Sequence, residues 1–452
     1  MKYGTVFGVA FPRTHALVTS RAKFLKILLL GAIFLSASQV LAQSPPIAWV
    51  VNNLSETLSE VDLSSGQVIT NAISLGSIPN DIIISGDKAY VVNSGSNHVQ
   101  IIDLSAQQTL GTIELYLGLN PYFIVLDGED RAFVSNWMTG NVSVLDLDSM
   151  TEIDTINTGG VPQGLCIVGD WLFISDVNYD FQTWSYGPGR LLAYSLTDLS
   201  FLGEAVIGTN PQVIEYGPDG RLHVVCTGNF ATVFGQVQII NPTDLAIEHS
   251  VTLGGSPGSI AFTSDGTAYL GAAGWTEDGY VYSYNGISYA VYHDENNPIL
   301  VPSAAMDVAV TNDDHVLVCC FNSDHLAELD ASGSLHETYL VGDGPLSVGI
   351  HESSTGIKPT QQLQKSYSLS HNFPEPFNSA TVIVYNLKTA TSVSLEVFDI
   401  RGRLVESRDL GFLRAGIQRA TFTPRSDLAS GMYWYRLETG SSTIKGSMLF
   451  LK

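Results

Sequence analysis

The sequence predicts an all-β protein, a seven-bladed β-propeller followed by a small immunoglobulin-like β-sandwich, and three observations lead to this prediction. A Gly-x-x-Pro turn, or a close variant of it, recurs with proline-to-proline steps of 42, 41, 49, 46, 45 and 43 residues. Short β-type runs separated by Gly, Asn, Asp and Ser turns fill each step, a combination that is typical of a propeller. Beyond residue 371 the β-rich pattern continues without this period. The turns end at Pro79, Pro121, Pro162, Pro211, Pro257, Pro302 and Pro345, and the copy at Pro302 lacks the glycine.

Charge divides the 452 residues into three segments whose net charges add up to −23. Residues 1–42 hold five basic and no acidic residues, residues 43–357 hold 37 acidic and four basic residues, and residues 358–452 hold 12 basic and seven acidic residues. The middle segment, at −33, repels polyphosphate and anionic lipid, so we expect neither nucleic acid nor a membrane surface as a partner. The four cysteines lie in apolar runs without a C-x-x-C pair, which favours buried hydrophobic side chains over a disulfide framework.

Residues 1–42 have the pattern of a secretory signal peptide. Arg21, Lys23 and Lys26 precede an apolar run over residues 27–35, and Val40-Leu41-Ala42 offers small residues at a cleavage site. We expect cleavage after Ala42. The apolar run is too short to cross a bilayer, so no transmembrane anchor is expected.

Residues 43–354 hold the repeats, and the two ends of this region complement each other. Three strand-like runs precede Pro79, whereas a single run follows Pro345. The last run can therefore complete the first blade and close the ring, which gives seven blades and leaves no open sheet edge.

Several repeats carry a short common motif at the end of their second strand. Residues 90–93 (Tyr-Val-Val-Asn), 49–52 (Trp-Val-Val-Asn) and 133–136 (Phe-Val-Ser-Asn) resemble the repeat of the YVTN β-propellers, although the last three repeats depart from it. This resemblance spans the whole repeat region. It implies an extracellular propeller that binds a ligand or a surface, and it implies no defined reaction.

Enlarged loops rich in aromatic residues follow the second strands of several repeats. We expect these loops and the Gly-x-x-Pro turns to surround one mouth of the propeller channel, where exposed rings suit glycan stacking or a protein partner. The alternative is that the rings pack their own loops and that the strand-end asparagines only form turn hydrogen bonds. The candidate ligand-binding residues are Trp137, Tyr179, Trp184, Tyr186, Phe230, Trp275 and Tyr280.

An enzymatic function would need titratable groups at the same mouth. Among the expected inner-strand starts, carboxylates at this level are supplied by Asp81 and Asp307, which are weak candidates for metal ligands because two do not make a cage. The histidines share no loop and form no i, i+4 pair, and neither a nucleophile elbow nor a phosphate-binding glycine loop is present. The pattern disfavours catalysis and predicts no cofactor.

The last part of the chain has a different character. Residues 355–371 are polar and predict a linker, and residues 372–452 predict a small sandwich. Its opening at residues 372–378, the turn at Arg401-Gly402-Arg403, the Gly431-Met432-Tyr433 strand and the end from Lys445 resemble the C-terminal sorting domain of type IX secretion cargo, with Glu375 in place of the usual Asn. This resemblance implies export across an outer membrane. The alternative is a terminal immunoglobulin-like module that the mature protein keeps.

These features together predict a protein that is secreted by, or displayed on, a Gram-negative bacterium. Its predicted function is non-catalytic binding of a glycan, a peptide or a surface partner at the loop-rich face, with the type IX secretion machinery as the partner of the C-terminal domain. The alternatives are a metal-assisted hydrolase of the lactonase type and a structural component of a surface layer.

Overall fold

The computed structural model describes residues 46–351 except 129 and 275–276, and then residues 370–373, 377–378, 380–387, 390–399, 401, 403–414, 416–425, 428–439 and 443–452. The predicted signal peptide, most of the predicted linker and Trp275 lie outside these residues. Within them the regular elements are β-strands, apart from one 3-10 turn, η1 (Phe321–Ser323). The predicted all-β class is confirmed.

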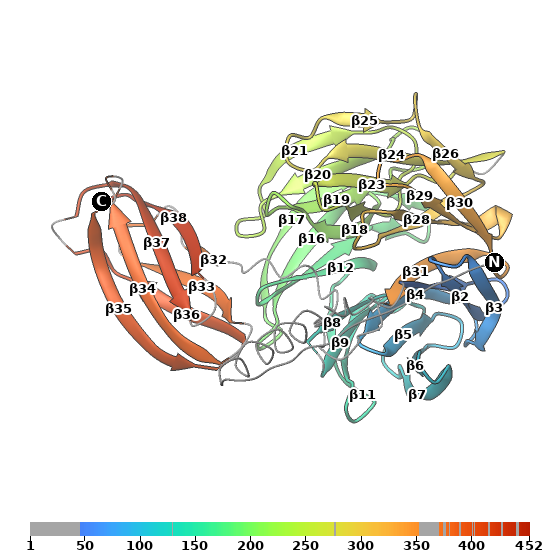
Figure 1. The fold of residues 1–452 in the computed structure, drawn as a ribbon, viewed down its shortest axis with the longest axis horizontal. Helices are drawn as coiled ribbons and strands as arrows, with labels where there is room; N and C mark the ends of the chain where they lie inside the picture. The colour runs from blue at the N-terminus through green and yellow to red at the C-terminus, as the bar shows by residue number, and fades with distance from the viewer. Residues whose placement is uncertain are drawn as a thin grey trace, which may run out of the picture. The chain divides into compact units, whose positions relative to one another are not determined.

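The described part of residues 46–351 forms seven sheets, which are traced from blue to orange in Figure 1. Sheet 1 contains β31 (Pro345–His351), β1 (Ile47–Asn52), β2 (Thr57–Asp62) and β3 (Gln67–Ser74). Sheet 2 contains β4 (Pro79–Ser85), β5 (Lys88–Asn93), β6 (His98–Asp103) and β7 (Gln108–Glu114). Sheet 3 contains β8 (Pro121–Asp127), β9 (Arg131–Asn136), β10 (Asn141–Asp146) and β11 (Thr151–Asn157).

The remaining sheets repeat this plan with local additions. Sheet 4 contains β12 (Pro162–Val168), β13 (Trp171–Asp176), β16 (Pro188–Ser195) and β17 (Phe201–Thr209), with a two-stranded ribbon of β14 (Tyr179–Asp180) and β15 (Ser185–Tyr186) inserted after β13. Sheet 5 contains β18 (Pro211–Tyr216), β19 (Leu222–Cys226), β20 (Gln236–Ile240) and β21 (Ile247–Thr252). Sheet 6 contains β22 (Ala261–Phe262), β23 (Thr267–Gly271), β24 (Asp278–Asn285), β25 (Val291–His293) and β26 (Ile299–Pro302). Sheet 7 contains β27 (Ala305–Val310), β28 (Val316–Cys320), β29 (His325–Leu329) and β30 (Leu335–Leu340).

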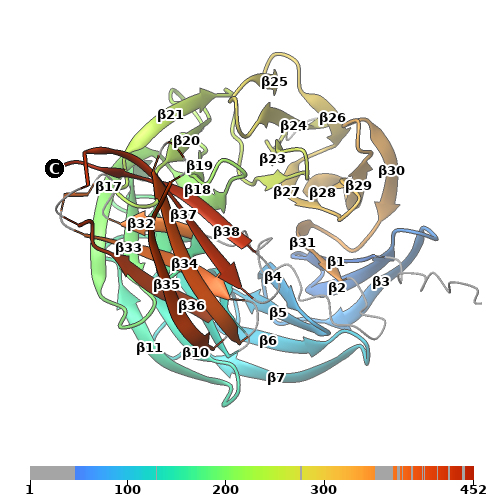
Figure 2. The same ribbon diagram turned by 60° about the vertical axis from the view of Figure 1, so that its left-hand side comes forward.

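The seven sheets are arranged around a common centre, and Figure 2 shows the first strands β31, β4, β18 and β27 on the inner side of their sheets. Strand β31 closes the arrangement because it pairs antiparallel with β1, with Val348 opposite Val50. The first sheet thus takes one strand from the end of the region and three strands from its beginning, which is the pairing expected from the sequence.

A separate hydrophobic cluster fills each junction between successive sheets. One cluster joins Val134 of sheet 3 to Val92 of sheet 2, and another joins Leu317 of sheet 7 to Val50 of sheet 1, so the series of junctions is continuous. Successive side chains along a strand point to opposite faces of its sheet, so they contribute alternately to the two junctions that flank that sheet. The four cysteines are buried in these clusters as free thiols, in agreement with the hydrophobic role expected for them.

Packing explains why the repeated turn contains a glycine. In five sheets a turn glycine lies against the last side chain of the second strand of its own sheet, and a Cβ atom there would come within 1.9 to 2.8 Å of that side chain. In sheet 4 this glycine is Gly160 rather than Gly159, and in sheet 6 Gly254 lies against Glu295 instead. Such an approach is closer than real Cβ contacts, so these positions require glycine. The turn glycine and the strand-end residue therefore form one packing unit. The pairs are Gly342 with Asn52, Gly76 with Asn93, Gly118 with Asn136, Gly160 with Asp176, and Gly208 with Cys226.

The described C-terminal residues form two further sheets that share one hydrophobic core. One sheet contains β32 (Ser370–Phe373), β33 (Thr381–Leu387) and β36 (Gly416–Phe422), and the other contains β35 (Leu404–Leu413), β34 (Thr391–Asp399), β37 (Gly431–Thr439) and β38 (Thr443–Phe450). Strand β32 begins at Ser370, ahead of the Asn372 at which the predicted module opens. The core combines residues such as Ile383 and Phe422 from the first sheet with Leu395 and Tyr435 from the second.

Candidate ligand-binding site

The Gly-x-x-Pro turns and the loops after the second strands lie together, because one hydrogen bond recurs from sheet to sheet. The first residue after the second strand donates its backbone N–H to the carbonyl oxygen of the residue that precedes the inner strand. This bond ties both segments to the same end of each sheet, where the aromatic loops also emerge. Its donor–acceptor pairs, with N···O distances of 2.8 to 3.0 Å, are Asn53 and Gly344, Ser94 and Ile78, Trp137 and Asn120, Val177 and Val161, Thr227 and Asn210, and Phe321 and Ala304.

Five aromatic side chains from sheets 3, 4 and 5 form a continuous cluster at this end. The ring of Trp137, just after β9, lies 5.6 Å from the ring of Tyr179 and 5.1 Å from that of Phe181, measured between centroids. Tyr179 lies 4.8 Å from Tyr186 across the β14–β15 ribbon, and Tyr186 lies 6.2 Å from Phe230 in the loop after β19. Most of these rings meet edge to face or tilted, which is the favourable geometry for aromatic pairs.

The cluster is packed on one side and exposed on the other. Trp137, Tyr179 and Tyr186 are half-buried, whereas Phe181 is 44% exposed and Phe230 is 61% exposed. Trp184, at the tip of the ribbon, is 77% exposed, and its backbone has a φ of 55°. A non-glycine residue in this left-handed region is uncommon and holds the indole at the end of the ribbon. The same rings therefore pack their own loops and present an apolar surface, and their role in ligand binding stays a prediction.

The remaining two aromatic candidates do not extend this cluster. Trp275 lies outside the described residues. Tyr280 lies in β24, is half-buried and packs against the cluster between sheets 5 and 6. In the described part of the chain no ring contact joins Tyr280 to the five-ring cluster.

Neutral polar side chains at the second position of the inner strands were missed by the search for aromatic and acidic residues. Gln163 in β12 donates through Nε2 to Oε1 of Gln212 in β18, and Gln212 donates through Nε2 to Oδ1 of Asn210 at 2.8 Å. Tyr122 in β8 accepts or donates a side-chain hydrogen bond with Gln163, and desolvation followed by the proximity of Tyr186 raises its pKa. These residues directly follow the repeated prolines, and they were passed over because the search at the inner-strand starts was for carboxylates. It offers hydroxyl and amide groups without a formal charge.

The strand-end asparagines point away from a ligand. The Nδ2 atom of Asn52 donates to the hydroxyl of Ser59 at 2.9 Å, and that of Asn136 donates to the hydroxyl of Ser143 at 2.8 Å. Both amides are fully buried. They fix the second strand to the third strand of their own sheet. Asn229, in the loop after β19, instead accepts the backbone N–H groups of Ala231, Thr232 and Val233 in a turn.

Asp81 and Asp307 are brought together by the closing strand. The Ser347 hydroxyl of β31 lies 3.2 Å from Oδ1 of Asp81 in β4 and 3.1 Å from Oδ2 of Asp307 in β27. A hydroxyl has one proton, so it cannot donate to two carboxylates at once, and both contacts are hydrogen bonds only when one carboxyl group is protonated. Desolvation raises the pKa of Asp81 to about 6, and desolvation together with the charge of Asp81 raises that of Asp307 to about 7.

A metal at this pair would require further ligands. In the ranges that the structure describes, no group of three His, Cys, Asp or Glu side chains is placed to hold a metal ion. The backbone N–H groups of Ile124 and Val348 also donate to the two carboxylates, at 3.0 and 3.1 Å, and occupy lone pairs that a cation would use. These residues do not fit a divalent cation, for which six or more oxygen ligands are usual.

Sequence comparison identifies the family of the C-terminal segment. Residues 371–449 match the model of the secretion system C-terminal sorting domain. This segment is a type IX sorting domain. It accounts for the motifs at Arg401 and Tyr433, and it indicates export by the type IX secretion machinery to the cell surface or the extracellular space. Among the described residues no helix is long and apolar enough to cross a membrane.

The chain is also similar to a curated protein and to several solved structures, all at low identity. Antigen Lp49 of Leptospira interrogans is 22% identical over 224 residues, which span 47% of this chain and 47% of that protein, so the match covers about half of the relative. A candidate 6-phosphogluconolactonase from Bacteroides fragilis superposes with a TM-score of 0.55 at 15% identity, over 68% of this chain and 98% of the other. A protein of unknown function from Desulfotomaculum acetoxidans gives 0.54 at 16% identity, over 68% and 99%. These similarities support a propeller-like fold and do not extend to function.

Proposed function

We propose that the protein is a secreted or surface-displayed binding protein, in which the seven sheets are the blades of a YVTN-like propeller and the sorting domain is an immunoglobulin-like sandwich. The sorting domain takes the protein out of the cell, and the propeller carries the ligand-binding face. Closing the ring through β31 and β1 supports this architecture, because it leaves no unpaired strand edge at the junction.

The aromatic cluster is the observation that carries the binding function. Trp184, Phe181 and Phe230 are large apolar side chains that remain exposed on neighbouring loops. Exposed apolar surface of this kind usually marks an interaction site. The cluster stands beside the Tyr122–Gln163–Gln212 layer, since desolvation by burial, followed by the proximity of Tyr186 and of Asp81, raises the pKa of Tyr122. Aromatic faces next to hydroxyl and amide groups suit the apolar and polar faces of a neutral sugar, so a glycan is the ligand we favour.

The double variant Trp184→Ala/Phe230→Ala tests this proposal. We expect a loss of about tenfold or more in affinity for any glycan that a glycan array identifies, measured by titration calorimetry, since the truncations remove the exposed Phe230 ring of the cluster and the exposed Trp184 indole at the tip of the ribbon. Tyr292→Ala is the matched control, because Tyr292 in β25 is exposed on the outer part of sheet 6. Unchanged affinity of the double variant would show that the ligand binds elsewhere.

A hydrolase of the lactonase type is the second candidate, and the Asp81–Ser347–Asp307 group is the observation in its favour. Two structural neighbours from Bacteroides species are described as candidate 6-phosphogluconolactonases, at 15% identity each. The pair could exchange a proton near neutral pH, but its oxygen atoms are already engaged by backbone donors. Hydrolysis of a lactone that is lost in Asp307→Asn and kept in Trp184→Ala/Phe230→Ala would favour this candidate over glycan binding.

A further inference from the structure

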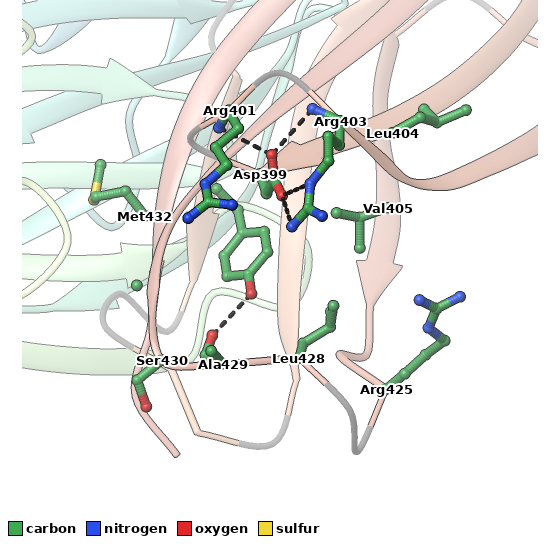
Figure 3. A pocket seen from close by; sticks show the side chains of 12 residues that line it. Asp399, Arg401, Arg403, Leu404, Val405, Arg425, Leu428, Ala429, Ser430 and Met432 are labelled. Carbon is green, nitrogen blue, oxygen red and sulfur yellow. Dashed lines mark hydrogen bonds and ion pairs between the residues drawn. The ribbon is translucent and has the colours of Figure 1, made fainter.

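The sorting domain contains a pocket that its secretion role does not by itself explain. The pocket has a volume of about 540 Å³ and lies between the turn at residues 399–403 and the segment that leads into β37 (Figure 3). This volume is within the usual range for a site that takes a small ligand or a few side chains. It is independent of the propeller and of the ligand proposed for it.

Cationic groups dominate the lining of this pocket. Arg401, Arg403 and Arg425 contribute three guanidinium groups, and Asp399 contributes the one carboxylate. That carboxylate is already used, because its oxygen atoms accept the backbone N–H of Arg401 at 2.9 Å, the backbone N–H of Arg403 at 3.0 Å and the Nε–H of Arg403 at 2.7 Å. These bonds, led by that from the Arg403 backbone, lower the pKa of Asp399, so it stays ionised and holds the turn together.

Arg401 takes no part in these hydrogen bonds with its side chain. Its backbone serves the turn, but its guanidinium has no hydrogen bond or ion pair with any residue that the structure describes. Figure 3 shows it on the opposite side of Asp399 from Arg403, among the residues that line the pocket. A planar guanidinium with all its donors available is suited to bind a carboxylate through two parallel hydrogen bonds.

Part of the remaining lining is apolar. Val405 and Leu428 lie on the inner side of the pocket (Figure 3), which the polar residues Ser430 and Tyr433 also line. Leu404 and Met432 also border the pocket, but Figure 3 shows their side chains pointing outward to either side. Hydrated phosphate or a lipid headgroup would leave Val405 and Leu428 unused, whereas a polypeptide with an acidic and an apolar side chain would use both the guanidinium and the apolar part of the lining.

We propose that this pocket binds an acidic, apolar segment of a protein partner, with a carboxylate on Arg401 and a neighbouring apolar side chain against Val405 and Leu428. Charge complementarity selects the occupant, since the pocket carries more guanidinium groups than carboxylates. The partner is a protein that the sorting domain meets during or after export.

The test uses the full chain and a labelled tetrapeptide, acetyl-Asp-Phe-Asp-Leu-amide, with fluorescence polarisation as the readout. We expect saturable binding that weakens with added salt, a loss of about tenfold or more in Arg401→Gln, and partial retention in Arg401→Lys. Arg414→Gln is the matched control, because Arg414 is an exposed arginine of the same domain that does not line the pocket. The matching peptide with Asn in place of Asp should not bind.

Several outcomes would overturn the proposal. Equal binding by Arg401→Gln and the wild-type protein, or no saturation by the Asp peptide up to about 1 mM, would exclude the carboxylate contact. If inorganic phosphate displaces the peptide at equal concentration, the pocket is a general anion site and not a peptide site. Vesicles of phosphatidylglycerol that bind the wild-type protein but not Arg401→Gln would assign it to a membrane surface instead. Thermal unfolding of each variant, followed by circular dichroism, separates loss of binding from loss of fold.

Discussion

At the scale of single residues, the repeated turn places strain on the residue that precedes the inner strand. This residue has a left-handed backbone in four of the turns, where it is Asn120, Asn210, Ala304 or Gly344, and in the turn of sheet 2, where it is Ile78 with a φ of 51°. Its carbonyl oxygen must point at the first N–H of the aromatic or polar loop, and the left-handed conformation makes this possible. Asn and Gly tolerate it, whereas a β-branched residue does so at a cost of about 1–2 kcal/mol.

Ile78→Asn should therefore stabilise the protein. The side chain of Ile78 is 49% exposed, so little packing is lost, and we expect a gain of about 1 kcal/mol in the free energy of unfolding, measured by urea denaturation. Ile287→Asn is the control, because Ile287 is also exposed and does not have a positive φ. A gain of equal size in the control would mean that removing an exposed apolar side chain, rather than relieving strain, is the cause.

At the scale of the structural element, five of the seven sheets depend on a contact between a turn glycine and the strand-end side chain of the second strand. A Cβ atom at Gly118 would lie 2.4 Å from the amide of Asn136, which is held by its hydrogen bond to Ser143 and is fully buried. The amide has no free direction in which to move. This contact explains why a turn glycine is followed by a strand-end asparagine at a similar separation in sheets 2 and 3, where the pairs are Gly76 with Asn93 and Gly118 with Asn136.

Gly118→Ala should destabilise the protein by about 1–3 kcal/mol, because overpacking forces the amide or the turn to shift. Gly258→Ala should have little effect, since nothing lies within 4 Å of the Cβ position there and its φ is not positive. In an Asn136→Ala background the cost of Gly118→Ala should fall, and a double-mutant cycle based on urea unfolding measures the coupling. Independent, additive costs would contradict the proposed contact.

At the scale of the whole propeller region, closure brings carboxylates together at its centre. Asp81 and Asp307 belong to sheets on either side of the closing strand and share Ser347, and the pKa of Glu215 in β18 is raised to about 7 by desolvation. A carboxyl group whose pKa is raised in the folded state binds its proton more tightly there than in the unfolded chain. It therefore stabilises the fold at low pH, and this contribution is lost as the pH rises from about 4 through the folded pKa.

Stability should accordingly decline between about pH 4 and pH 7, on top of the other titrations. Asp307→Asn should make this decline shallower, because one of the raised groups no longer titrates and repulsion of Asp81 is removed. The measurement is the urea midpoint at each pH unit. Since the lost hydrogen bond to Val348 lowers stability equally at every pH, the slope is the informative quantity. A slope identical to that of the wild-type protein would show that Asp307 does not hold a shifted proton.

The sequence by itself determined the features that depend on neighbours along the chain. The forty-residue spacing of prolines set the β class and the repeated strands, and the motifs around Arg401 and Tyr433 identified the sorting domain, which the family match over residues 371–449 confirmed. The YVTN character of the repeats and the blade count stay predictions. Strands and turns can be predicted in this way because they depend on the alternation of side chains and on hydrogen bonding between residues that are close in the sequence.

Tertiary structure alone decided which of the candidate residues meet. It joined Trp137 to Tyr179 and Phe181 from the next sheet, left Tyr280 in another junction, and placed Ser347 on Asp81, from which it is 266 positions distant. The repeat period fixes where each loop leaves its sheet, but not the direction in which an inserted ribbon folds or which side chains the closure of the ring brings into contact. Those outcomes depend on long-range packing between sheets, which no local pattern encodes.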